Sequence, residues 1–169
     1  MKTIFVGSEP TRMALSSDGT QLFVGLNGAG AVRQVNLTTA TAGIQFALGG
    51  GPGVYNPPYT AQGLAVLPGQ PNSVAVYGSN GVVTIFDSGV ARAMTSTGLS
   101  VDFDQNSGSL SFGSSASILY LNSQSTSANL YALSIDATGV TGATSLGGNG
   151  GGNSISTTIT GFIFLPEQS

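Results

Sequence analysis

The chain has 169 residues and carries few charges, four basic and seven acidic, for a net charge of −3. It contains no cysteine and no histidine, which excludes disulfide frameworks, thiolate or imidazole metal sites, haem ligation and Ser-His or Cys-His catalytic pairs. Four dispersed cations argue against binding to nucleic acid, and a hydrophobic content of 40% argues against disorder.

Short apolar runs bounded by Gly, Asn, Asp or Pro recur along the chain, a pattern typical of strands and turns. The first four runs lie at residues 13–16, 22–26, 31–37 and 43–48. Asp18-Gly19 separates the first two runs and is typical of a tight hairpin turn, because glycine accepts the positive φ that such a turn needs. We therefore expect a four-stranded antiparallel unit over residues 11–48.

The same order of runs restarts at residues 61–95 and again at residues 109–145. The segment Gly161-Phe162-Ile163-Phe164-Leu165-Pro166 repeats the pattern of Gly63-Leu64-Ala65-Val66-Leu67-Pro68. The period is about 50 residues, with four strands in each unit. An all-β fold is expected, a β-propeller segment of four-stranded antiparallel blades. The alternative is a β-sandwich whose hairpins happen to be similar.

Residues 7–24 carry a family resemblance. They follow the pattern G-x-x-P-x-x-(apolar)-A-(apolar)-S-x-D-G and continue into an apolar strand that ends on Val24. This resembles the first half of a YVTN-type β-propeller repeat. The second unit has Pro68-Gly69 in place of the Ser-x-Asp-Gly turn, and the third unit is degenerate there. The resemblance implies the propeller fold; because such propellers serve surface-layer, binding and enzymatic roles, it implies no specific activity.

The number of repeats predicts an incomplete ring. Residues 1–6 are expected to form the outer strand of a preceding blade, and residues 160–166 the inner strand of a following one. Three blades and two extra strands are fewer than the roughly 4–8 blades of a closed propeller. The sequence favours a part of a larger propeller; association of several copies into one ring is the alternative.

Candidate ligand-binding residues are expected at one face, where inter-blade loops and the loops after second strands of propellers meet. Tyr55 and Tyr59 flank a Pro-Pro pair between the first two blades, and Asn27 and Asn80 lie in turns after second strands. Tyrosine offers a flat apolar ring with a polar tip that suits sugars or peptides. The alternative is that the tyrosines pack against a neighbouring blade.

Arg12 lies at the start of an inner strand, where it is expected to face the central channel and either pair with Glu9 or bind an anion.

Asp102, Asp104 and Asn106 place oxygen ligands at alternate positions, as in calcium loops. The following glycine comes one residue late, and Gly113 stands where a calcium loop has a carboxylate. The alternative is a solvated turn between the second and third blades. No cofactor is expected for this chain, and calcium is the one alternative considered.

The function expected from the sequence is a non-catalytic extracellular binding or scaffold module of a bacterial protein. Its expected ligand is a protein or a glycan on the loop face, and the remaining blades come from the same or another chain. One alternative is a lactonase-like or glycan-cleaving enzyme with part of its site on other blades. A second is a homo-oligomeric sugar-binding propeller. No apolar run is long enough for a membrane span. An extracellular or cell-surface location is expected from a composition rich in Gly, Ser, Thr and Asn and poor in Lys.

Overall fold

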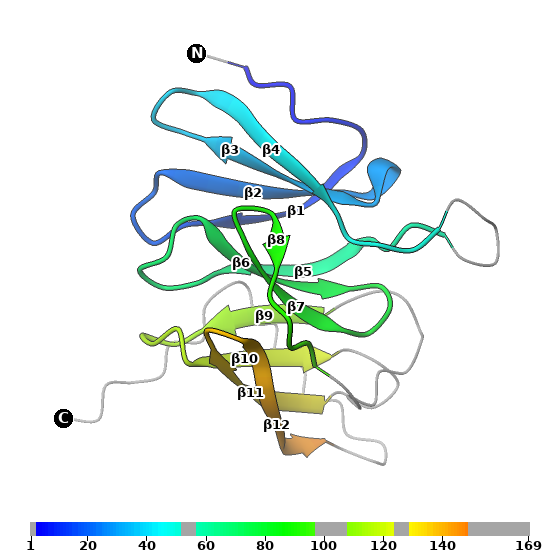
Figure 1. Ribbon diagram of the computed structural model, residues 1–169, viewed down its shortest axis with the longest axis vertical. Coiled ribbons are helices and arrows are strands. Elements are labelled where there is room, and N and C mark those ends of the chain that lie inside the picture. Colours follow the sequence, from blue (N-terminus) through cyan, green and yellow to red (C-terminus); the bar gives the residue numbers. More distant parts are fainter. Residues whose placement is uncertain (1–2, 52–56, 97–107, 124–128, 149–169) are drawn as a thin grey trace.

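The computed structural model describes residues 3–51, 57–96, 108–123 and 129–148, which form three four-stranded antiparallel sheets (Figure 1). We call the sheets β1–β4, β5–β8 and β9–β12 blade 1, blade 2 and blade 3. The strands are β1 Pro10–Leu15, β2 Gln21–Leu26, β3 Ala31–Asn36, β4 Thr41–Ala47, β5 Ala61–Val66, β6 Ser73–Gly78, β7 Val83–Asp87, β8 Val90–Ala91, β9 Gly108–Phe112, β10 Ile118–Ser123, β11 Asn129–Asp136 and β12 Gly139–Gly148. A single 3-10 turn, η1 Asn27–Ala29, follows β2. The predicted fold class, an all-β propeller segment with an incomplete ring, is confirmed.

The three sheets cover residues 10–47, 61–91 and 108–148. The ranges expected for the blades from the sequence are 11–48, 61–95 and 109–145. β8, the fourth strand of blade 2, has only two residues. The inner strand expected at residues 160–166 lies outside the described residues.

The hydrophobic core lies between the blades, because each strand directs alternate side chains to opposite faces of its sheet. Phe23 and Val32 of blade 1 pack with Val74 of blade 2 in one buried cluster. Phe46 and Phe86 extend this cluster with ring centroids 4.8 Å apart. A second cluster joins blades 2 and 3; its largest fully buried members are Leu67, Ile85, Leu119, Leu121 and Leu133. Stacking of adjacent blades therefore supplies most of the apolar burial.

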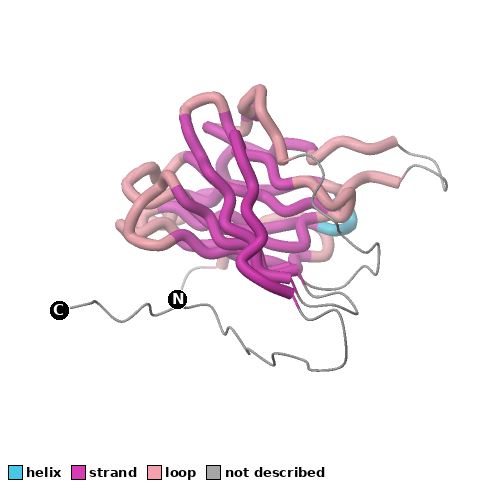
Figure 2. Tube along the Cα trace, turned by 90° about the horizontal axis from the view of Figure 1, so that it is seen from below, coloured by secondary structure: helices cyan, strands magenta, loops and turns pink. Residues whose placement is uncertain are grey.

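The first strands β1, β5 and β9 lie side by side at the inner edge of the three blades. A side chain on Gly63 would place its Cβ 2.9 Å from the carbonyl oxygen of Gly108. Glycine is required where two backbones approach this closely. Figure 2 shows the sheets from below, with hairpin turns on one side and η1 on the other.

Residues 3–9 lie on the outer face of blade 1 and contain no strand, although the sequence predicts one within residues 1–6, at the apolar residues 4–6. Ile4 and Val6 pack against the buried Val24, Leu26 and Val35, and Phe5 between them is 86% exposed. Side chains thus alternate as in a strand, but no described strand lies alongside to share backbone hydrogen bonds, and these bonds define a strand.

Residues 92–96, which we call the strap, connect the outer edges of blades 2 and 3. The Arg92 and Ser96 amides donate to the carbonyls of Ile85 and Val83 on β7, at 2.8 and 3.0 Å. Between them, Met94 forms a parallel bridge to Gly139 at the start of β12. The chain therefore leaves β8 early because its backbone pairs alternately with two blades.

Within the described parts of the chain, no helix is both long and apolar enough to cross a membrane.

Candidate functional site

Three connections form a continuous surface at one end of blades 1 and 2, which we call the loop face: η1 with Gly30, residues 57–60 and residues 79–81. Gly30 has a φ of 55° and lies directly against Pro58, which leaves no room for a side chain. The amide of Ser79 donates to the Thr60 carbonyl at 2.9 Å, and its hydroxyl accepts from the Thr60 amide at 3.0 Å. These contacts hold the three connections in a fixed relation.

The two predicted asparagines both lie on the loop face. Asn27 accepts a hydrogen bond from the Thr11 hydroxyl at 3.0 Å through its Oδ1. Asn80 accepts from the Val82 amide at 3.2 Å in the turn between β6 and β7. In the described part of the chain the Nδ2 group of each asparagine has no hydrogen-bond partner. The oxygen of Asn27 thus ties its turn to β1 and that of Asn80 supports its own turn, while the two amide donors of each residue are not used by the described residues.

Tyr59 lies in the connection between β4 and β5 and is half-buried. Its ring rests against Gly49, whose added Cβ would lie 3.5 Å from the tyrosine Cδ2. Its backbone amide donates to the Gly49 carbonyl at 3.0 Å. This contact lies within the connection itself, between its two ends, and is not the packing against a neighbouring blade that was the alternative for the sequence. Tyr55 lies outside the described residues.

Arg12 is exposed on β1, close to the loop-face end of blade 1. Over the described ranges the only ion pair joins Asp87 and Arg92, so the pairing of Arg12 with Glu9 is not observed there. The calcium candidates Asp102, Asp104 and Asn106 lie outside the described residues. Among the residues that are described, no three acidic side chains gather as a metal site would require.

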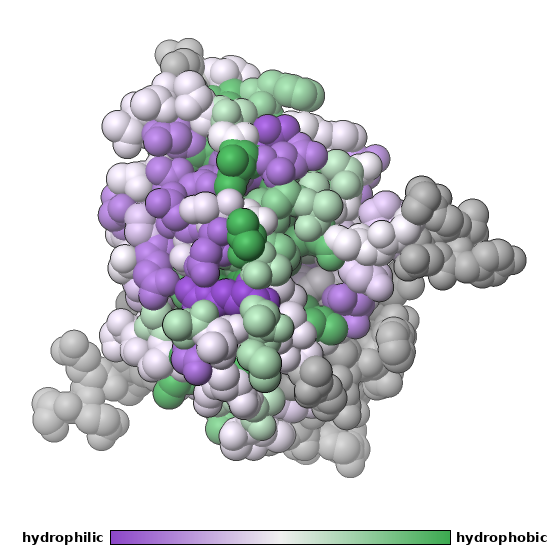
Figure 3. Space-filling view, in the orientation of Figure 1, coloured by the Kyte–Doolittle hydropathy of each residue, from purple (hydrophilic) through white to green (hydrophobic). Residues whose placement is uncertain are grey.

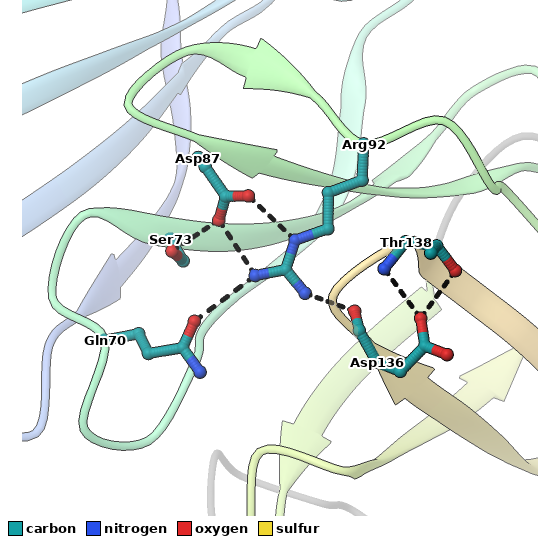
Figure 4. Close-up of polar contacts among 6 residues, drawn as sticks. All are labelled: Gln70, Ser73, Asp87, Arg92, Asp136 and Thr138. Carbon is teal, nitrogen blue, oxygen red and sulfur yellow. Dashed lines mark hydrogen bonds and ion pairs between the residues drawn. The ribbon is translucent and has the colours of Figure 1, made fainter.

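The densest polar cluster lies at the opposite end, where hairpin turns of blades 2 and 3 meet (Figure 4). Arg92 donates from Nε to Asp87 Oδ2 at 2.8 Å and from Nη2 to Asp87 Oδ1 at 2.9 Å. Its Nη1 donates to the backbone carbonyl of Asp136 in blade 3, and Nη2 also reaches Gln70 Oε1 at 3.2 Å. Ser73 donates to Asp87 Oδ1 at 2.6 Å. We call these residues the Arg92 cluster.

The electrostatics of the cluster follow from these contacts. Hydrogen bonds from Arg92 lower the pKa of the Asp87 carboxyl, despite the opposing effect of burial. The same bonds raise the pKa of the Arg92 guanidinium. Hydrogen bonds from Thr138 lower the pKa of Asp136, whose carboxylate accepts from the Thr138 amide and hydroxyl at 2.7 and 2.6 Å. Asp136 therefore stabilises the hairpin turn between β11 and β12.

A hollow of about 380 Å³ adjoins the Arg92 cluster between blades 2 and 3. Its floor includes Leu67 and Ile135, and Gln70, Ser115 and Ser117 stand on its rim. The guanidinium beside it already bonds to two side chains and one carbonyl. The cluster therefore serves first to join two blades. The Arg92 cluster was not predicted from the sequence. The one sequence signal for it is that an arginine follows five positions after Asp87, the acidic residue that ends β7.

Comparisons with known proteins support the fold. No protein-family model matches the chain, and no curated protein matches it by sequence. Similar solved structures include U3-55K, with a TM-score of 0.60 and 15% identity over 82% of this chain and 37% of the other. They also include the RRP9 WD40 repeats, with a TM-score of 0.59 and 16% identity over 82% of this chain and 36% of the other.

A third similar structure is KlHsv2 with its loop 6CD replaced by a Gly-Ser linker, with a TM-score of 0.61 and 13% identity over 88% of this chain and 49% of the other. The chain thus spans less than half the length of each of these proteins. Identities this low establish the fold alone. The three sheets of this chain are blades of a β-propeller, arranged as an incomplete ring.

Proposed function

We propose that this chain is a non-catalytic protein-binding scaffold whose partner is recognised by the loop face. The observation that carries the proposal is the continuity of that face, in which residues 57–60 contact Gly30 after η1 on one side and Ser79 on the other. A rigid set of loops on a sheet scaffold limits the ordering entropy that binding would otherwise cost.

The chemistry of the loop face suits a protein surface. Its residues are Asn, Tyr, Ser, Thr, Ala, Gly and Pro, and none is charged. Tyr, Ser, Gly and Asn are also the residues that dominate antibody recognition loops, where the aromatic ring gives contact area and the small polar groups give adaptable hydrogen bonds. Tyr59 would supply the aromatic anchor, and Asn27 and Asn80 the amide donors.

The proposal also includes the repeat family of the chain, its location and the larger propeller to which it belongs. The chain carries YVTN-type repeats, acts outside the cell and forms part of a larger propeller in which another blade covers the outer face of blade 1. Support comes from equivalent positions in the blades. Met13 is paired with Val24 in blade 1 as Leu64 is with Val76 in blade 2, yet Met13 is 70% exposed and Leu64 only 9%.

Replacing Tyr59 with alanine is expected to weaken partner binding at least tenfold, because a central aromatic anchor contributes about 2 kcal/mol or more. The immobilised chain would be exposed to extracellular proteins of its source organism, and the affinity of each purified partner measured by calorimetry. Ile118→Ala, an exposed change outside the loop face, is the matched control and should leave the affinity unchanged. A partner that binds wild type and Tyr59→Ala equally well would contradict the assignment to the loop face.

A further inference from the structure

The outer edge of blade 3 already forms a backbone bridge with a segment from elsewhere in the chain, at Met94 of the strap. The Met94 amide donates to the Thr138 carbonyl at 2.8 Å, and the Val140 amide donates to the Met94 carbonyl at 3.0 Å. Gly139 permits this approach: it has a φ of 127°, and a Cβ there would collide with the Met94 carbonyl oxygen. Figure 1 shows the chain descending from β8 to lie beside the start of β12. The edge is therefore competent for strand addition.

The pairing by the strap ends where the chain turns back to blade 2, since Ser96 donates to Val83 on β7. Beyond that point, residues 141–146 of β12 are all exposed. They read Thr-Gly-Ala-Thr-Ser-Leu and include no charge and no proline. Sheet edges are usually protected from pairing by lysine, proline or bulges. Here the register shifts only at the two ends of residues 142–145, and those four residues pair regularly with β11.

A hollow of about 260 Å³ lies between the strap and β12. Its wall consists of Ala93, Met94, Thr95, Ser96, Val140, Thr141, Gly142 and Ala143. None of these side chains is charged. Arg92, the one cation of the strap, turns away toward Asp87, and only 10% of its side chain is exposed. Five of the eight lining residues have apolar side chains or none, and three carry a hydroxyl, so a small apolar side chain fits the hollow at the end of the free edge.

Met94 of the strap is 48% exposed beside the hollow. Val90 of β8 and Ile44 of β4 are also exposed, on the outer strands of blades 2 and 1 and outside the hollow. In Figure 3 strongly apolar side chains emerge over β4 and β8 among more polar neighbours. Of these three side chains, only Met94 is placed to contact a chain bound in the hollow.

We propose that the β12 edge binds an extended peptide segment of another protein, which adds as a strand along residues 142–145 and places an apolar side chain in the hollow beside Met94. Backbone hydrogen bonds supply the affinity of such strand addition, and the side-chain pocket supplies its specificity. This site on the β12 edge is independent of the loop face and of the function proposed for the loop face.

An extended peptide fits better than a second copy of the chain. Two β12 edges paired with each other would bring residues 142–145 of both copies together, and these are Gly, Ala, Thr and Ser. None of the four has a large apolar side chain to fill the hollow. The strap also occupies the first part of the edge, which leaves a length suited to a short segment.

The test uses the full chain and a fluorescent peptide of alternating residues, acetyl-Thr-Val-Thr-Val-Thr-Val-Thr-amide. Fluorescence anisotropy is expected to show saturable binding. An analogue with N-methyl groups on the alternate amides that face the edge should bind at least tenfold more weakly, because it lacks the donors. Equal binding of both peptides, or no binding of either, would overturn the proposal.

Two protein variants locate the binding. Ala143→Lys puts a charge on the hollow and is expected to weaken peptide binding at least tenfold, whereas Val90→Lys, on β8 outside the hollow, should have no effect. Circular dichroism verifies that both variants fold. Tyr59→Ala should bind the peptide normally, which separates this site from the loop face. Peptide binding unaffected by Ala143→Lys, or a mass in light scattering that doubles with concentration and is returned to the monomer by that change, would refute the proposal.

Discussion

Leu64→Ala is expected to lower the free energy of unfolding by about 2–5 kcal/mol, the range for truncating a buried leucine. Leu64 is 9% exposed and belongs to the cluster that joins blades 1 and 2. Its removal deletes apolar burial and leaves a cavity, because the flanking strands of both sheets hold their positions through backbone hydrogen bonds. Urea denaturation followed by circular dichroism measures the loss as a lower midpoint with an unchanged slope.

Met13→Ala is the matched control, because Met13 occupies the equivalent position of blade 1. With 70% of its surface exposed, it should change the stability of this chain by less than about 0.5 kcal/mol. In a longer protein in which a further blade covers β1, the same substitution should cost as much as Leu64→Ala. Equal costs for the two substitutions in this chain would mean that the outer face of blade 1 is already covered, contrary to the open ring.

The fold could be predicted from the sequence because its determinants are local and repeated. The Asp18-Gly19 turn, the alternation of apolar residues and the recurrence of the Gly-apolar-Pro segment each specify one strand or one hairpin. Repetition then specifies the stacking, since a blade can bury its apolar faces only against another blade. The strand expected at residues 4–6 shows the limit. Its alternation is correct, but a strand also needs a hydrogen-bonding neighbour, and that neighbour is not encoded in the segment itself.

The strap shows the same limit for blade 2. The apolar run near residues 90–94 predicts a full fourth strand, but β8 ends at Ala91. The chain leaves because Met94 pairs with Gly139, and that pairing depends on a glycine far along the sequence. Local propensity cannot detect such a partner.

The candidate site divides in a similar way. The strand order alone places Asn27, Tyr59 and Asn80 at one end of the blades, because connections after second strands and between blades emerge there. The Arg92 cluster could not be predicted in this way. Arg92 meets the carbonyl of Asp136 across the junction of two blades, and the three-dimensional position of a hairpin turn decides that contact.

Removal of this arginine is the second large effect expected. Arg92→Ala should lower the free energy of unfolding by about 1–3 kcal/mol, since it removes charge-assisted hydrogen bonds to Asp87 and the contact with blade 3. The lower part of this range is expected, because 46% of the Asp87 side chain is exposed and water replaces part of the interaction. Arg92→Lys should recover only part of the loss, because lysine cannot donate to both carboxylate oxygens and to Asp136 together. Arg12→Ala, which removes an exposed arginine on β1, is the control and should change stability by less than about 0.5 kcal/mol.

The pH dependence of stability distinguishes the ion pair from simple packing. Arg92 lowers the pKa of Asp87 in the folded chain below the ordinary carboxyl value of 3.8. The folded state therefore binds the Asp87 proton less readily than the unfolded state, and the resulting stability is fully present above pH 3.8 and lost as the pH falls through the lowered value. In Arg92→Ala the largest cause of the lowered pKa is lost and the Ser73 hydrogen bond remains, so stability should fall less steeply on acidification than in wild type. Asp18 and Asp136, whose carboxyl pKa values are also lowered, keep their main hydrogen-bond donors in both proteins and give a common background. Parallel acid profiles for wild type and Arg92→Ala would mean that Arg92 joins the blades through packing of its side chain rather than through its charge.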